Sequence, residues 1–204
     1  MARMIGVLGG TFDPPHLGHL ILAEFGRAAL ALDEVLWVLT PVSPFKLDRP
    51  ITPLEHRLAM VAVVVADHTS FSLSRADIDR SPPYYAIGTM ETLRQRYPDA
   101  NLVYLMGSDS LRDLPRWHQS RRFVAACNSL GVMMRPGAGY DAAQLEKDIP
   151  GITGKLRFFD APFVGISGHD IRQRVREGKT IRYVVIDQVL AYINEHILYA
   201  PESE

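Results

Sequence analysis

The stretch "MIGVLGGTFDPPHLGH" (residues 4–19) joins a short apolar run to a turn rich in glycine, proline and histidine. The apolar run predicts a buried β-strand, and a helix is expected to begin near Leu17. Between them, Gly9 and Gly10 let the backbone turn tightly and approach a ligand closely, because neither carries a Cβ. Free N–H groups at a helix start behind such a turn favour an anion, phosphate above all. The stretch therefore predicts a phosphate-binding turn.

Two histidines, His16 and His19, lie three residues apart at the expected helix start, so both rings can point the same way. Each would meet the anion as a hydrogen-bond donor, and a nearby phosphate raises the pKa of an imidazole. Two alternatives stay open here. One is a metal site, although zinc takes three or four ligands and we find no spaced partner set. The other is a pair of surface side chains on a capped helix.

The same stretch argues against a nicotinamide-dependent dehydrogenase. That fold marks its first turn with G-x-G-x-x-G and ends its second strand in an acidic residue. Here the glycines fall as "GVLGG", and the second apolar run ends in "VLTPVSP". Neither requirement is met.

Short apolar runs alternate with amphipathic segments along the rest of the chain. Most runs are continuous, as expected for strands covered on both faces. The alternation predicts an α/β fold, with a Rossmann-like parallel sheet and helices on both faces, whose ligands bind beyond the carboxyl ends of the strands. Strands are expected at 4–8, 34–40, 71–78, 102–107, 130–135 and 156–161, and helices at 17–31, 54–67, 85–97, 118–126, 141–148, 168–177 and 184–197.

Composition narrows the class of protein. The 204 residues carry 22 basic and 23 acidic side chains, a net charge of -1, which gives no support for a nucleic-acid partner. The basic run 172–182 lacks interleaved aromatic residues. No apolar run approaches the ~18 residues of a membrane helix, and no leader ends in a cleavage site. The single cysteine, Cys127, excludes an intramolecular disulfide and is expected to be buried. We expect a cytoplasmic protein without a membrane partner.

Several motifs together resemble a known family. "GGTFDPPHLGH" is similar to the T/HxGH loop of the nucleotidyltransferase superfamily, and in this form it resembles bacterial nicotinate-nucleotide adenylyltransferases. The resemblance covers most of the chain, because further blocks follow in the order of that family. These blocks are "PVSPFK" (41–46), "EHRLAM" (55–60), "SPPYYAIGTMETL" (81–93), "GSDSLRDLPRWH" (107–118), "ISGHDIR" (166–172) and "VLAYINEHILY" (189–199).

The resemblance implies an adenylyl transfer that serves NAD biosynthesis. In this family the phosphate of nicotinate mononucleotide attacks the α-phosphorus of ATP in line, and pyrophosphate leaves. A phosphate monoester is already ionised near neutral pH, so the protein needs neither a nucleophile nor a strong base. Mg²⁺ is expected on the triphosphate, held by the nucleotide and water and by no protein side chain. The partners are then ATP and nicotinate mononucleotide, and monomer or homo-oligomer is left open.

The ATP site follows from the same resemblance. His16, His19 and Lys46 are the implied catalytic residues, all in contact with phosphates. Ser167 and Arg172 would bind the β and γ phosphates. A single domain over 1–204 is expected, with an α/β core at 1–165 and C-terminal helices at 166–200 that close this site. The implied ATP-binding residues are Gly9, Gly10, Thr11, Phe12, Gly107, Asp109, Arg135, Ile166, Ser167 and Arg172.

The acceptor site is implied by the middle blocks. Trp117 would stack on the pyridine ring, although a half-buried core tryptophan is the alternative. Tyr85 and the amides near Ala86 would hold the nicotinate carboxylate. Asp109 would bind a ribose hydroxyl or cap a helix, and Arg135 would border the adenine.

Two places depart from the family pattern. Tyr84 and Ala86 stand where serine and threonine are usual, so carboxylate recognition would rest on backbone N–H groups. Gly168 and His169 stand where two hydroxyl residues are usual. His169 is then either a third imidazole at the phosphates or a solvent-facing residue. The segment 41–53 is the expected mobile flap.

Two other functions stay open. One is another small-phosphate nucleotidyltransferase, such as a phosphopantetheine adenylyltransferase, against which the tryptophan block and the last helix argue. The other is a nucleotide-binding module without catalysis, against which the intact His16, His19 and Lys46 argue.

Overall fold

The computed structural model describes residues 2–42, 50–135, 137 and 139–201. Its centre is a six-stranded parallel sheet in the order β3-β2-β1-β4-β5-β6. The first strand therefore lies in the middle, and the chain winds outward from it in both directions. The strands are β1 (Met4–Gly10), β2 (Glu34–Leu39), β3 (Phe71–Ser74), β4 (Asn101–Gly107), β5 (Ser129–Met133) and β6 (Leu156–Phe159).

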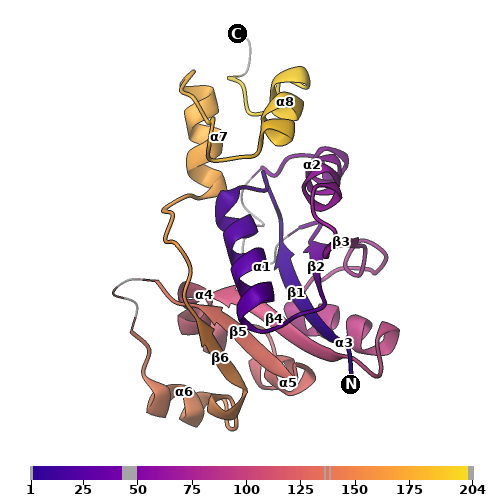
Figure 1. Ribbon diagram of the computed structural model, residues 1–204, viewed down its shortest axis with the longest axis vertical. Helices are drawn as coiled ribbons and strands as arrows, with labels where there is room; N and C mark the ends of the chain where they lie inside the picture. Colours follow the sequence, from indigo (N-terminus) through magenta and orange to yellow (C-terminus); the bar gives the residue numbers. More distant parts are fainter. Residues whose placement is uncertain (1, 43–49, 136, 138, 202–204) are drawn as a thin grey trace.

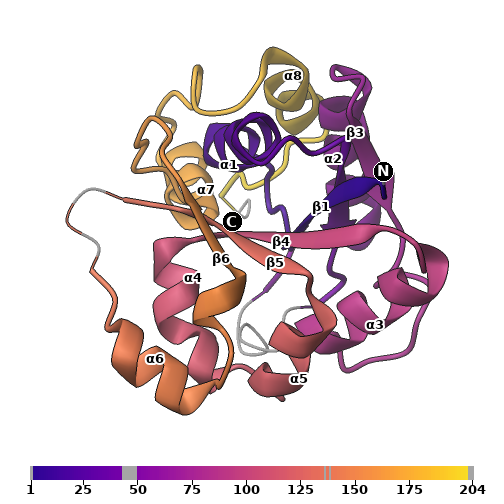
Figure 2. The same cartoon turned by 60° about the horizontal axis from the view of Figure 1, so that its bottom comes forward.

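Helices cover both faces of the sheet (Figures 1 and 2). One face carries α1 (Leu17–Ala29), α2 (Leu54–Ala66), α7 (Gly168–Arg176) and α8 (Asp187–Glu195). The other face carries α3 (Ala86–Arg96), α4 (Ser108–Asp113), α5 (Ser120–Ala126) and α6 (Ala142–Asp148). No helix in the ranges that the structure describes is long and apolar enough to cross a bilayer.

The core is split by the sheet into two apolar clusters. Ile5 and Val7 of β1 point to the cluster beneath α3 and α5, whereas Leu8 points to the cluster beneath α1 and α2. In β2, Leu36 points to the cluster beneath α3 and α5, and Trp37 points to the cluster beneath α1 and α2. Because both faces are buried, the strands read as continuous apolar runs rather than as alternating ones.

The predicted α/β fold is confirmed, with all six strands and all seven predicted helices present. Two details differ. The expected strand 71–78 ends at Ser74, because the chain then turns and the Asp79 N–H donates to the Arg75 carbonyl oxygen at 2.9 Å. The short helix α4 was not among the predicted helices, since six residues are too few to show a helical period.

Candidate active site

A cleft of about 520 Å³ opens where β1 and β4 end side by side. At this point the strand order reverses, so the loops after the two strands diverge and leave a crevice. The volume suits a nucleotide-sized ligand. One wall comes from the turn after β1 and the start of α1, and the opposite wall from the start of α3 and the loop around Trp117. After the ligands expected from the sequence, we call the first wall the phosphate side and the second wall the pyridine side.

On the phosphate side, the two histidines stack on each other. Their ring centroids lie 3.8 Å apart with an interplanar angle of 26°. The His16 backbone N–H donates to His19 Nδ1 at 3.2 Å, so a neutral His19 ring carries its proton on Nε2. Phe12 packs edge-on against His19. His16 is 7% exposed, which makes the surface-histidine alternative wrong for it.

A buried arginine braces the turn that carries these histidines. Arg57 of α2 is 1% exposed, and its guanidinium donates to four backbone carbonyl oxygens. Nη1 reaches Thr11 at 2.9 Å and Thr40 at 3.0 Å, Nη2 reaches Pro41 at 2.6 Å, and Nε reaches Thr52 at 2.8 Å. Burial lowers the pKa of Arg57 from its usual value. The arginine thereby ties the turn after β1 to the loop after β2.

Asp13 binds the same turn to the C-terminal part of the chain. Its carboxylate accepts from the Tyr199 hydroxyl at 2.9 Å, and its carbonyl oxygen accepts from Arg172 Nη1 at 2.6 Å. Burial, and then the charge of Asp13, raise the pKa of Tyr199. A Cβ at Gly168 would lie 2.7 Å from the Asp13 carbonyl oxygen, so a larger residue at this position would require the backbone to shift.

The pyridine side is an aromatic wall. Trp117 lines the cleft and also packs on the core, with its ring edge-to-face against Tyr104 at 6.1 Å. The two interpretations of Trp117 are therefore compatible. Tyr85 is the N-cap of α3 and stacks on His118, with ring centroids 4.0 Å apart. Ala86 begins α3 and faces the same cleft.

Asp109 and Arg135 meet at the end of β4 and β5. The carboxylate of Asp109 accepts from Arg135 Nη1 and both residues line the cleft. The guanidinium of Arg135 also lies 5.5 Å from the centroid of the Phe163 ring. The N-cap of α4 is Gly107, so the capping alternative for Asp109 is wrong.

Most of the predicted site residues come together in this cleft, two described ones do not, and one is not described. The Phe12 ring is buried in the core, so only its backbone is available to a ligand. Arg172 is bound to Asp13 beside the cleft. Lys46 lies outside the described residues, as does most of the predicted flap at 41–53. The predicted residues that line the cleft are Gly9, Gly10, Thr11, His16, His19, Tyr85, Ala86, Gly107, Asp109, Trp117, Arg135, Ile166 and Ser167.

Several polar residues of the cleft were not predicted from the sequence. Asp77, Thr40 and Thr89 line it together, close to Tyr85. Asp77 was hidden because the apolar pattern predicts a strand through residue 78, whereas ligand-binding residues were sought just after each strand. His169 is exposed and lies outside the cleft-lining set. Within the described ranges, no group of three or more His, Cys, Asp or Glu side chains is arranged to hold a metal ion.

Comparison with known proteins shows which family the chain belongs to. The family model described as cytidylyltransferase-like matches residues 7–174. A probable nicotinate-nucleotide adenylyltransferase of Thermomicrobium roseum is 43% identical over 98% of this chain and 92% of its own length. One of a Roseiflexus species (strain RS-1) is 42% identical over 96% of this chain and 97% of its own length.

A solved structure shows the same fold. It is that of Plasmodium falciparum nicotinic acid mononucleotide adenylyltransferase complexed with NaAD, and it aligns over 97% of both chains with a TM-score of 0.75 at 18% identity. The family itself is shown by the family model and the sequence relatives. The chain belongs to the cytidylyltransferase-like proteins and, within them, to the nicotinate-nucleotide adenylyltransferase family.

Proposed function

We propose that this protein joins ATP and nicotinate mononucleotide to give nicotinate adenine dinucleotide and pyrophosphate. The observation that carries the proposal is the cleft itself, which has stacked imidazoles on one side and an aromatic wall on the other. A triphosphate fits the first side because backbone N–H groups and imidazoles donate to anions. A pyridine ring fits the second because aromatic faces stack. Membership of the family supports the same substrates.

For this transfer the protein needs only to position the two nucleotides and to stabilise the charge that develops on the phosphates. A phosphate oxygen of the mononucleotide attacks the α-phosphorus of ATP, the bond from that phosphorus to the bridging oxygen breaks, and pyrophosphate leaves with the electron pair. We propose that His16 and His19 donate to the triphosphate, with Lys46 reaching the phosphates from the loop after β2. In this scheme the Gly9–Gly10 turn and Thr11 border the phosphates closely, since no Cβ intervenes at the glycines.

The remaining ATP contacts are proposed as follows. Ser167 and Arg172 bind the β and γ phosphates, and residues 166–200 close the site over a core of 1–165. This closure is supported by the bonds that Arg172 and Tyr199 make to Asp13 in the turn after β1. The other proposed contacts are Gly107 and Asp109 at the ribose, Arg135 beside the adenine, and Phe12 and Ile166 along the nucleotide.

The acceptor is proposed to bind between Trp117 and the start of α3. Trp117 stacks on the pyridine ring, and the amides near Tyr85 and Ala86 receive the carboxylate. Since Ala86 has no hydroxyl, this recognition rests on backbone N–H groups.

A divalent cation, Mg²⁺, is proposed to enter on the triphosphate, because phosphate oxygens are the ligands that it prefers, and there it would neutralise developing charge. We propose that the reaction runs in the cytoplasm, which the free and buried Cys127 supports.

A pyrophosphate-release assay with ATP tests the proposal. Nicotinate mononucleotide, nicotinamide mononucleotide and phosphopantetheine are offered in turn, and we expect release chiefly with the first. Release with phosphopantetheine alone would point to a different acceptor class. No release with any of the three would favour a binding module and overturn the proposal.

A further inference from the structure

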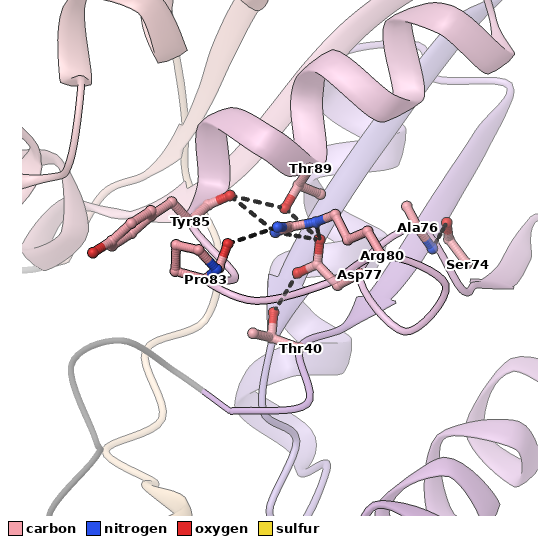
Figure 3. Close-up of polar contacts among 8 residues, drawn as sticks. All are labelled: Thr40, Ser74, Ala76, Asp77, Arg80, Pro83, Tyr85 and Thr89. Carbon is pink, nitrogen blue, oxygen red and sulfur yellow. Dashed lines mark hydrogen bonds and ion pairs between the residues drawn. The ribbon is translucent and has the colours of Figure 1, made fainter.

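A carboxylate with only 1% exposure lies in the floor of the pyridine side, outside the residues that the proposed reaction uses. It belongs to Asp77, in the turn after β3. One of its oxygens, Oδ2, accepts from Thr40 Oγ1 at 2.9 Å, and the other, Oδ1, accepts from Thr89 Oγ1 at 2.7 Å (Figure 3). Arg80 completes the set, donating to Oδ1 from Nε at 3.1 Å and from Nη2 at 3.0 Å.

Arg80 carries the contact on to the residues that enter α3. Its Nη1 donates to the Pro83 carbonyl oxygen at 2.7 Å, and its Nη2 to the Tyr85 carbonyl oxygen at 3.2 Å (Figure 3). The guanidinium lies directly beside Gly88, where an added Cβ would be 3.2 Å from Arg80 Cζ. Arg80 thus holds the N-cap of α3 in place from behind, while the aromatic face of Tyr85 is turned to His118.

The network joins three elements at one carboxylate. Thr40 follows β2, Asp77 follows β3, and Thr89 lies in the first turn of α3. Charge-assisted hydrogen bonds are stronger and shorter than neutral ones, and a buried group with all its partners in place is rigid. The distance between the end of β2 and the start of α3 is therefore fixed by Asp77.

We infer that Asp77 is a positioning residue that sets the preference for an acid over an amide in the pyridine nucleotide. The inference rests on the proposed function. Nicotinate and nicotinamide differ in one group, so discrimination depends on how closely the first amides of α3 meet two carboxylate oxygens. Asp77 acts through Thr89 and Arg80, because its own oxygens already accept four bonds. A displacement of this kind by about 1 Å costs up to about 100-fold in rate.

The test compares Asp77→Asn with Asp79→Asn as a matched control. Asp79 lies two residues on, makes exposed ion pairs with Arg75 and Arg96, and is outside the cleft-lining set. For Asp77→Asn we expect the ratio of kcat/KM for nicotinate mononucleotide to that for nicotinamide mononucleotide to fall by about 10-fold to about 100-fold, with the KM for ATP unchanged. For Asp79→Asn both quantities should stay at the wild-type value.

Two other outcomes would overturn the inference. If Asp77 served only the stability of the fold, both acceptors would lose activity equally and the ratio would not move. If Asp77 acted as a bare negative charge beside the acceptor, the substitution would improve the use of the acid. A wild-type enzyme that fails with nicotinate mononucleotide would instead defeat the proposed function, so the two failures are distinguishable.

A second pair of variants keeps the test open should Asp77→Asn fail to fold. Thr89→Val removes the hydroxyl that donates to Asp77 and keeps the shape, whereas Thr89→Ser keeps the hydroxyl. We expect Thr89→Val to lower the acid-to-amide ratio and Thr89→Ser to restore it. Equal ratios in the two folded variants would overturn the inference.

Discussion

The two sides of the cleft are held in place by different means. On the phosphate side, the supporting groups come from distant parts of the chain: Arg57 from α2, Arg172 from α7 and Tyr199 from beyond α8. They bind mainly backbone carbonyl oxygens, in the turn after β1 and in the loop after β2. On the pyridine side, the contacts join side chains within residues 40–89 around Asp77. The phosphate side therefore depends on the completed fold, whereas the pyridine side depends on a few local side chains.

The contrast between the two sides indicates where the protein tolerates substitution. A backbone turn braced from two helices and from the segment after α8 is expected to resist substitution, because these elements also pack on the core. A wall fixed by one carboxylate network is expected to change with single substitutions. Thr40 connects this network to the phosphate side, but its carbonyl oxygen is held there separately by Arg57. We therefore expect that substitutions can change acceptor choice without changing the binding of ATP.

The largest effect is expected from the two stacked histidines. His16→Ala and His19→Ala should each lower kcat by about 10²–10³, because a preorganised donor to developing charge is lost. Steady-state assays with ATP and nicotinate mononucleotide measure this. His169→Ala is the matched control, since His169 is exposed and outside the cleft-lining set, and it should retain the wild-type rate. A double variant of His16 and His19 at full speed would contradict the assignment of the phosphate side.

Arg57→Met should have the next largest effect, and it separates positioning from stability. Removing the guanidinium leaves carbonyl oxygens at Thr11, Thr40 and Pro41 without this donor, so the free energy of unfolding should fall by about 3 kcal/mol. The KM for ATP should rise by about tenfold, because the turn after β1 loses its brace. Urea unfolding and steady-state kinetics measure the two quantities.

A matched arginine exists on the other side of the sheet. Arg94 of α3 donates to the carbonyl oxygens of Ala100 and Ala126, before β4 and β5 begin and therefore far from the cleft. Arg94→Met should also lower the free energy of unfolding, but the KM for ATP should not change. Equal KM values in the Arg57 and Arg94 variants would show that Arg57 has no positioning role.

Local sequence patterns predicted the strands and the turn after β1, because the residues that determine these parts are neighbours in the sequence. Continuous apolar runs such as the one through Ile5 and Val7 marked strands correctly, since both faces of the sheet are buried. The turn after β1 was recognised because its glycines, histidines and helix start lie together in the sequence. The contacts of Arg57 were not predicted, because its partners lie 5 to 46 residues away and leave no periodic signal. Asp77 was missed because the residues after β3 continue the pattern that predicts a strand through residue 78. The true end of β3 at Ser74 was therefore not recognised.

Alkaline pH is expected to act on the core beneath the pyridine side. Burial raises the pKa of the Cys127 thiol from its ordinary 9.0 to about 12, so the folded state keeps a proton that the unfolded chain releases. Stability from this group is complete below about pH 9 and is lost as the pH rises toward about 12. At about pH 10 the loss is about 1.4 kcal/mol.

The measurement is urea unfolding of the wild type and Cys127→Ala at about pH 8 and about pH 10. Burial is the largest cause of the raised pKa of Tyr104 and is present in both proteins, so the difference between the two reports chiefly on the thiol. The variant should lose less free energy of unfolding between the two pH values. Parallel losses in both proteins would show that the thiol is not responsible.

The smallest effect is expected where the C-terminal segment meets the phosphate side. Tyr199→Phe removes one hydrogen bond to Asp13, so the free energy of unfolding should fall by about 1 kcal/mol. Because the remaining braces stay, the KM for ATP should rise only about two- to threefold, and the acid-to-amide ratio should not move. Tyr183→Phe is the control, since Tyr183 lies in the same segment and is 77% exposed. A Tyr199→Phe variant that shifts the acid-to-amide ratio would mean that the two sides are coupled, and the contrast between them would fail.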